Sequence, residues 1–275
     1  MTEAELKLHG SGWAKLELLR QAKSGNCFTG EVAAYAEASL GQEQKPWITL
    51  LNTGVFPDQD INQAPAAYLV QKEWITLLED SINSGRSKHW HAYNQLGIMY
   101  YAAGEMGKAK EAFENSRRLT NNAWAIRNLA ALKASEGNTS EAADMLLEAM
   151  KLLVIPQLAK ECGAALLEAK RYADFIAYYN TLPKDIQQSG RIQVLLAMAA
   201  AKTDDFELCH KILTSGIQVY DMREGEILLS DCWIELHKRR LIKEEGAVDN
   251  DALTARVRQE FPVPADIDFR MNTSM

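Results

Sequence analysis

The 275-residue sequence has few of the residues and patterns that mark metal proteins and secreted proteins. It has only four cysteines, and none of them forms a CxxC pair: Cys27, Cys162, Cys209 and Cys232. Such scattered cysteines argue against a zinc site or a disulfide framework and favour a reducing compartment. We therefore predict a cytoplasmic protein without a metal site.

Long apolar runs and long basic runs are also missing. The N-terminal stretch MTEAELKLHG is acidic and has no apolar core, so we do not expect a signal peptide. No segment is apolar over the length that a bilayer requires. The formal net charge is -7 and basic residues are dispersed. Nucleic acid and anionic membranes are therefore excluded as expected partners.

The motifs of the common enzyme classes are absent as well. The sequence contains no GxGxxG, no P-loop and no GxSxG nucleophile elbow. Cys162 and the Cys209-His210 pair have no spacing that suggests catalysis. We assign no catalytic residue and expect no cofactor, so an enzyme activity of the chain on its own is disfavoured.

What the sequence does contain is a repeat. Four two-residue positions recur at steps of 33 residues: Leu96-Gly97, Leu129-Ala130, Cys162-Gly163 and Leu195-Leu196. A later position of the same repeat holds Ala109, Ala142, Phe175 and Leu208, and a large residue follows four positions on. A small residue that lets two helices approach, with a large one beside it, is typical of an αα-hairpin. Gly104 and Gly137 fall where the first two hairpins must turn.

The first two units resemble the tetratricopeptide repeat (TPR), whose period is about 34 residues. The residues that carry the resemblance are Tyr93, Leu96, Gly97, Tyr100, Ala109 and Phe113, then Leu129, Ala142, Leu146 and Ala149. The third and fourth units are degenerate, because Phe175 and Leu208 replace a small residue. The resemblance implies an all-α fold, a right-handed α-solenoid of TPR-like hairpins.

The flanking segments predict helical caps, since an uncapped solenoid would expose an apolar face. We expect a capping segment over 1–87, repeats over 88–215, and capping helices with an extended tail over 216–275. In the first segment, 47–54 and 68–85 are predicted helices separated by a proline-containing loop. In the last, 223–241 and 249–261 are predicted helices, the second stopped by Pro262.

The HWH stretch at His89–His91 is the one histidine motif that suggests a metal. Residues two apart on a helix lie about 200° apart around its axis, so His89 and His91 should point to opposite sides. They would not close on one ion, and an ordinary helix start is the favoured interpretation.

The resemblance implies a binding surface instead. In TPR arrays the first helix of each hairpin lines the concave face. The positions that match in this sequence are His91, Asn94, Tyr101, Trp124, Arg127, Asn128, Lys160 and Arg191. A tryptophan beside Arg127 and Asn128 suits stacking and hydrogen bonding to a peptide or a sugar. The alternative is that Trp124 belongs to the core, as most tryptophans do. The family's carboxylate clamp is not reproduced, because Ile98 and Ala131 stand where it needs polar groups.

A second resemblance links several phrases, among them GWAKLELL, EASLGQEQKPW and REGE. They look like the C-terminal half of a bacterial family that joins a mutarotase-like β-sandwich to TPR repeats, which implies a carbohydrate context. Glu224, Glu226 and Asp231 form an acidic cluster that could act on a glycoside. Glu224 and Glu226 would diverge on a helix, and acidic residues at a helix start are ordinary.

These patterns lead to two hypotheses. The favoured one is a non-catalytic scaffold that binds a protein partner, a peptide or a companion domain on its concave face. The alternative is the helical half of a carbohydrate-active protein, which would bind an oligosaccharide or a β-sandwich domain.

Overall fold

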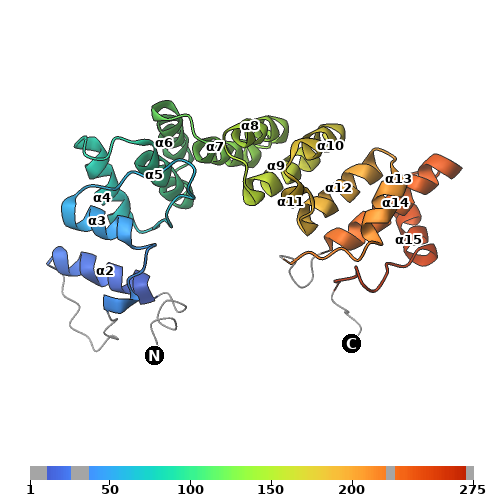
Figure 1. The fold of residues 1–275 in the computed structure, drawn as a ribbon, viewed down its shortest axis with the longest axis horizontal. Helices are drawn as coiled ribbons and strands as arrows, with labels where there is room; N and C mark the ends of the chain where they lie inside the picture. The colour runs from blue at the N-terminus through green and yellow to red at the C-terminus, as the bar shows by residue number, and fades with distance from the viewer. Residues whose placement is uncertain (1–10, 26–36, 221–226, 271–275) are drawn as a thin grey trace. The chain divides into compact units, whose positions relative to one another are not determined.

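The computed structural model describes residues 11–25, 37–220 and 227–270. These residues form fourteen α-helices and one 3-10 helix, without a strand (Figure 1). The predicted all-α class of TPR-like helical hairpins is confirmed. The chain divides into two compact units, residues 1–132 and 133–275. No helix in the described ranges is long and apolar enough to span a membrane.

Unit 1 holds the N-terminal helices and the first hairpin. Its elements are α2 (Ser11–Lys23), the 3-10 helix η1 (Glu37–Ser39), α3 (Lys45–Thr53), α4 (Lys72–Asn83), α5 (Trp90–Ala102), α6 (Met106–Leu119) and most of α7 (Ala123–Ser135). Its core is aromatic: Trp47, Phe56 and Trp74 are each at most 1% exposed. The Trp47 ring lies 5.0 Å from Phe56 and 5.9 Å from Trp74, measured between ring centroids.

Unit 2 continues the hairpins and ends in two further helices. Its elements are α8 (Thr139–Leu152), α9 (Pro156–Glu168), α10 (Tyr172–Thr181), α11 (Lys184–Gln187), α12 (Gly190–Lys202), α13 (Phe206–Leu213), α14 (Leu228–Glu245) and α15 (Asp251–Glu260). Small side chains fill the centre of α12, where Ala197, Ala199 and Ala200 are fully buried. They allow α12 to pack against α9, α13 and α14.

Close packing within the hairpins explains the small residues of the repeat. A Cβ atom on Gly97 of α5 would lie 2.5 Å from the Phe113 ring of α6. In the third hairpin, a Cβ atom on Gly163 would lie 2.8 Å from the ring of Phe175. Phe175 is fully buried although a small residue is expected there. The glycine on the facing helix makes room for the ring, so the degenerate hairpin still closes.

The hairpin turns keep one backbone conformation through all four repeats. Gly104 and Gly137 have φ values of 79° and 83°, in the left-handed region as predicted. Lys170 and Asp204 take the same place in the next two hairpins, with φ values of 58° and 62°. This conformation costs a residue with a Cβ roughly 1–2 kcal/mol. The turn geometry therefore persists where the sequence signature is lost.

The predicted helix over 68–85 is shorter in the structure. It begins at Lys72, so Tyr68 and Val70 are not part of it; both side chains are about half exposed. Val70 was expected on the apolar face of the helix, and the structure corrects this. At the other end of the chain, α14 begins at Leu228 and ends four residues beyond the predicted helix 223–241, whose residues 223–226 lie outside the described residues. The last helix, α15, lies within the predicted range 249–261 and stops two residues before Pro262.

We expect Gly97→Ala to lower the free energy of unfolding by about 2 kcal/mol, because the added methyl group overlaps the Phe113 ring. Gly107→Ala is the matched control, since a Cβ at this α6 position meets no atom within 4 Å. That change should stabilise by about 0.5–1 kcal/mol through helix propensity. Urea unfolding followed by tryptophan fluorescence measures both. Equal effects of the two changes would contradict the close-packing argument.

Candidate functional site

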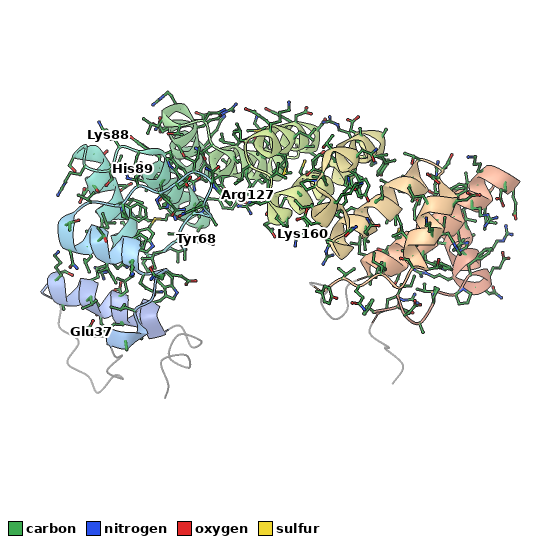
Figure 2. The ribbon with its side chains drawn as sticks, in the orientation of Figure 1. Glu37, Tyr68, Lys88, His89, Arg127 and Lys160 are labelled. Carbon is green, nitrogen blue, oxygen red and sulfur yellow. The ribbon has the colours of Figure 1, made fainter. Side chains whose placement is uncertain are left out.

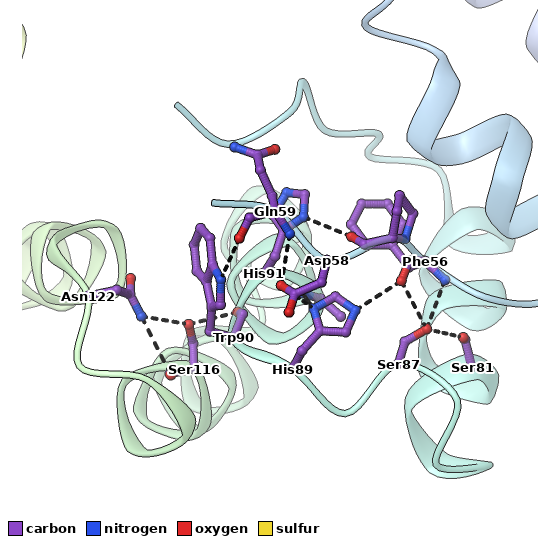
Figure 3. Close-up of polar contacts among 12 residues, drawn as sticks. Phe56, Asp58, Gln59, Ser81, Ser87, His89, Trp90, His91, Ser116 and Asn122 are labelled. Carbon is purple, nitrogen blue, oxygen red and sulfur yellow. Dashed lines mark hydrogen bonds and ion pairs between the residues drawn. The ribbon is translucent and has the colours of Figure 1, made fainter. Parts of the chain in front are cut away.

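The candidate site of unit 1 is the face of α5 and α7, which is covered by a long loop. This loop, residues 54–71, connects α3 to α4 and is called the face loop below. It leaves α3 at Gly54, whose φ of 71° ends the helix, and a turn at residues 60–63 reverses its course. Figure 3 shows the polar contacts that hold its first half.

The outgoing limb of the face loop is bound through its backbone. The Phe56 N–H donates to Ser87 Oγ at 2.8 Å, and Ser81 Oγ donates to the Gly54 carbonyl at 2.7 Å. The Trp90 indole N–H donates to the Gln59 carbonyl at 3.0 Å. The Phe56 ring is fully buried and anchors the limb in the core. This limb is therefore held by its backbone groups and by one buried apolar side chain.

The tip and the returning limb are bound in the same way. The Trp124 indole on α7 donates to the Ile61 carbonyl at 2.9 Å. On the way back, Gln95 Nε2 donates to the Ala66 carbonyl, and the Trp47 indole donates to the Ala67 carbonyl at 2.8 Å. In total, seven carbonyl groups of the face loop accept hydrogen bonds from side chains outside it.

The two histidines of HWH both contact the face loop, contrary to the prediction that they point to opposite sides. His89 Nε2 lies 2.9 Å from the Phe56 carbonyl oxygen, and His91 Nδ1 lies 3.1 Å from that of Pro57 (Figure 3). The helical angle does not apply, because His89 precedes the helix as its N-cap with extended backbone, φ −137° and ψ 166°. Its Nδ1 accepts from the Ala92 N–H at 3.3 Å. No group of three or more metal-binding side chains exists among the described residues.

Four of the residues predicted for the binding face come together in unit 1. His91 and Asn94 of α5 are at most 1% exposed, and Trp124 of α7 is 9% exposed. Asn128 Nδ2 donates to Asn94 Oδ1 at 3.0 Å and so joins the two helices. Trp124 is thus a buried side chain, as in the core alternative, and its N–H binds an extended segment. A role for these residues toward another molecule stays a prediction.

The other predicted residues lie elsewhere or outside this description. Tyr101 is 39% exposed at the end of α5, and Arg127 is partly exposed on α7. Lys160 of α9 and Arg191 of α12 belong to unit 2 and are partly exposed; Figure 2 labels Arg127 and Lys160. Asp231 is exposed in the first turn of α14. Glu224 and Glu226 lie outside the described residues.

Three buried polar atoms of α5 lack a hydrogen-bond partner among the described residues: His91 Nε2, Asn94 Nδ2 and Gln95 Oε1. They stand at positions that share one side of the helix, under the face loop. A buried polar group without a partner costs about 1–3 kcal/mol. This side of α5 therefore offers both donors and acceptors beyond those that the face loop uses.

Burial also determines the charge of His91. Desolvation lowers its pKa to about 4, an effect that the Pro57 carbonyl and Asp58 oppose and His89 adds to. The imidazole is therefore neutral at pH 7, and Nδ1 carries the proton that it donates to Pro57. Protonation of Nε2 would place a charge in a dry environment under the face loop.

The sequence analysis did not identify the residues outside the repeats that bind the face loop. The main ones are Trp47, Ser81 and Ser87. Their side chains donate to carbonyl groups 20 to 31 residues away in the sequence. The one sequence signal was the pair of prolines, Pro57 and Pro65, in a segment without helical periodicity. That signal predicts a loop but not where it docks.

We expect the free energy of unfolding of unit 1 to fall by about 2 kcal/mol between pH 7 and pH 5, because the unfolded chain binds a proton at His91 near pH 6.5 and the folded chain only near 4. The folded pKa is depressed, so stability is lost as pH falls through this window. Urea unfolding followed by tryptophan fluorescence reports mainly unit 1, which holds five of the six tryptophans. His91→Phe should remove most of this pH dependence. An unchanged pH dependence in that variant would contradict the assignment.

Comparison with known proteins gives only weak likeness in structure. Neither family models nor curated proteins give a match. A solved structure titled "Functional Characterization of Pseudomonas Aeruginosa pilF" is similar, with a TM-score of 0.47 and 16% identity. The likeness covers 71% of this chain and 86% of that chain. At this level it supports no conclusion about function, which must come from the geometry of the chain itself.

Proposed function

We propose that the protein is a non-catalytic interaction scaffold, and that the α5/α7 face of unit 1 binds an extended segment of a protein partner. The observation that carries the proposal is the bound face loop. Seven of its carbonyl groups accept hydrogen bonds from side chains, so this face already binds an extended polypeptide. Contacts to carbonyl groups depend little on side-chain identity.

The segment that fits this face has a defined character. It would be extended, would place an apolar side chain where Phe56 is buried, and would offer carbonyl groups to Trp90, His91 and Trp124. Proline suits such a segment, because it favours extended backbone and has no N–H that needs an acceptor. Asn94 and Gln95 supply a free donor and a free acceptor for a partner with polar groups of its own.

The face loop is the resident occupant, so it competes with a partner. The apparent affinity for a partner falls by the fraction of time that the face is open. Weakening the loop without changing the face should therefore strengthen binding in trans. The carbohydrate alternative is not favoured by the described residues: they form no strand, and the two carboxylates that share a cavity, Glu207 and Glu244, are both exposed, with Glu244 paired to Arg240.

The test uses a fluorescent peptide of residues 54–71 and the full chain. We expect weak binding to the wild type and at least about tenfold tighter binding to Phe56→Ala, which removes the anchor of the resident loop. Adding Trp124→Phe should weaken binding again, because the donor to Ile61 is lost. Fluorescence anisotropy measures the affinity, and a scrambled peptide is the control.

A second, milder variant is needed because Phe56 is a core residue, and its truncation could unfold unit 1. Gln59→Ala removes the bonds from Nε2 to the Gln63 and Ala64 carbonyls, at 3.2 Å and 2.7 Å, that join the two limbs of the loop. Because Gln59 is only partly buried, unit 1 should stay folded. If neither folded variant binds the peptide better than the scrambled control, the α5/α7 face is not the interaction surface.

A further inference from the structure

A cavity of about 450 Å³ lies between α13 and α14 in unit 2. On α13 it is lined by Phe206 and His210, which are four residues apart, and on α14 by Leu236, His237 and Arg240. Residues with this spacing share one face of a helix, so one face of α13 and one face of α14 line the same cavity. The volume is in the range that suits a small organic molecule.

His237 is held in the wall of the cavity by aromatic rings alone. Its ring stacks on Phe261 with centroids 4.2 Å apart and planes at 11°, and it meets Trp233 edge-on at 4.7 Å. The residue is 6% exposed. Neither ring nitrogen has a hydrogen-bond partner among the described residues. Trp233, by contrast, satisfies its N–H with the Phe261 carbonyl at 3.1 Å.

This arrangement is costly for a purely structural residue. A neutral imidazole always presents one N–H donor and one lone pair, and buried polar groups of this kind are nearly always paired. A phenylalanine would keep both ring contacts without an unpaired polar group. The unpaired nitrogens are buried in the wall of the cavity, where they leave a donor and an acceptor that a molecule bound there could pair.

The charged side chains near the His237 ring bear on the charge that a ligand in the cavity would carry. Desolvation, and to a smaller extent the charges of Arg240 and His210, lower the pKa of His237 to about 4. The charges that act on the His237 ring are therefore positive, whereas the lining as a whole carries Lys211 and Arg240 beside Glu207 and Glu244. Glu207 and Glu244 also line the cavity but are exposed, and Glu244 accepts from Arg240 Nε at 2.9 Å. That bond occupies one of the five donors of the guanidinium.

We propose that this cavity is a binding site for a small organic carboxylate. The carboxylate would accept from the His237 N–H and from Arg240 or Lys211, and the apolar part of the ligand would pack on Phe206 and Leu236. The site belongs to unit 2 and does not depend on the α5/α7 face. Either proposal can therefore fail without the other.

The first test follows the His237 ring by NMR in the full chain labelled with ¹⁵N-histidine. His237→Phe assigns its signal among the five histidines. The probes are butyrate and benzoate, with butyramide as the uncharged control and inorganic phosphate as the competing anion. We expect saturable shifts of the His237 nitrogens with the carboxylates, and a pKa raised by at least about one unit, because a bound anion stabilises the imidazolium.

The second test separates binding from structure with variants. Arg240→Gln should weaken benzoate binding at least about tenfold, while Arg258→Gln, an exposed change on the neighbouring α15, should not. His237→Phe should abolish binding and leave the Tm unchanged or higher, because it removes two unpaired polar atoms. A lower Tm in this variant, with benzoate affinity unchanged, would show that His237 has only a structural role.

Three further outcomes would overturn the proposal. They are the absence of saturable shifts with either carboxylate, shifts of the same size with butyramide, and saturable shifts with phosphate alone. Saturable shifts with the carboxylates that disappear in Arg240→Gln but persist in Arg258→Gln would establish the site.

Discussion

The structure of unit 1 depends on one constraint: buried indole and imidazole N–H groups need acceptors that helices cannot supply. Trp47 and Trp90 are at most 3% exposed, and Trp124 is 9% exposed. In a helix nearly every carbonyl accepts within the same helix, so a neighbouring helix offers few free acceptors. A segment without secondary structure has free carbonyls. The face loop and the tryptophans therefore satisfy each other, and each would carry unpaired groups without the other.

This constraint also explains the composition of the face loop. Pro57 and Pro65 have no N–H, so fewer donors of the loop need partners, and the described part of the unit has no strand to supply them. Phe56 and Leu69 bury an apolar side chain near each end, and Asp60 caps the turn by accepting from the Asn62 N–H at 2.9 Å. The loop is thus an acceptor-rich segment with two anchors. These are also the properties that we propose for a partner segment at the same face.

The repeat could be predicted from the sequence because its determinants are local. The 33-residue period, the left-handed turn at Gly104 and the contact of Gly97 with Phe113 all act within one hairpin. The face loop could not be placed, since Trp124 and Ile61 are 63 residues apart and no short pattern joins them. Its prolines predicted only a loop. His89 was misplaced for a related reason: one residue outside the helix boundary no longer follows the helical angle.

The two buried histidines show why burial alone does not identify a site. In both, desolvation lowers the pKa to about 4, so both are neutral near pH 7. His91 Nδ1 donates to the Pro57 carbonyl, and this contact fixes the tautomer and occupies one ring nitrogen in a hydrogen bond within the protein. His237 is oriented by ring stacking, so its position does not depend on which nitrogen is protonated. Its donor and its acceptor both remain unpaired among the described residues, and this difference from His91 is the reason why we propose a ligand site at His237.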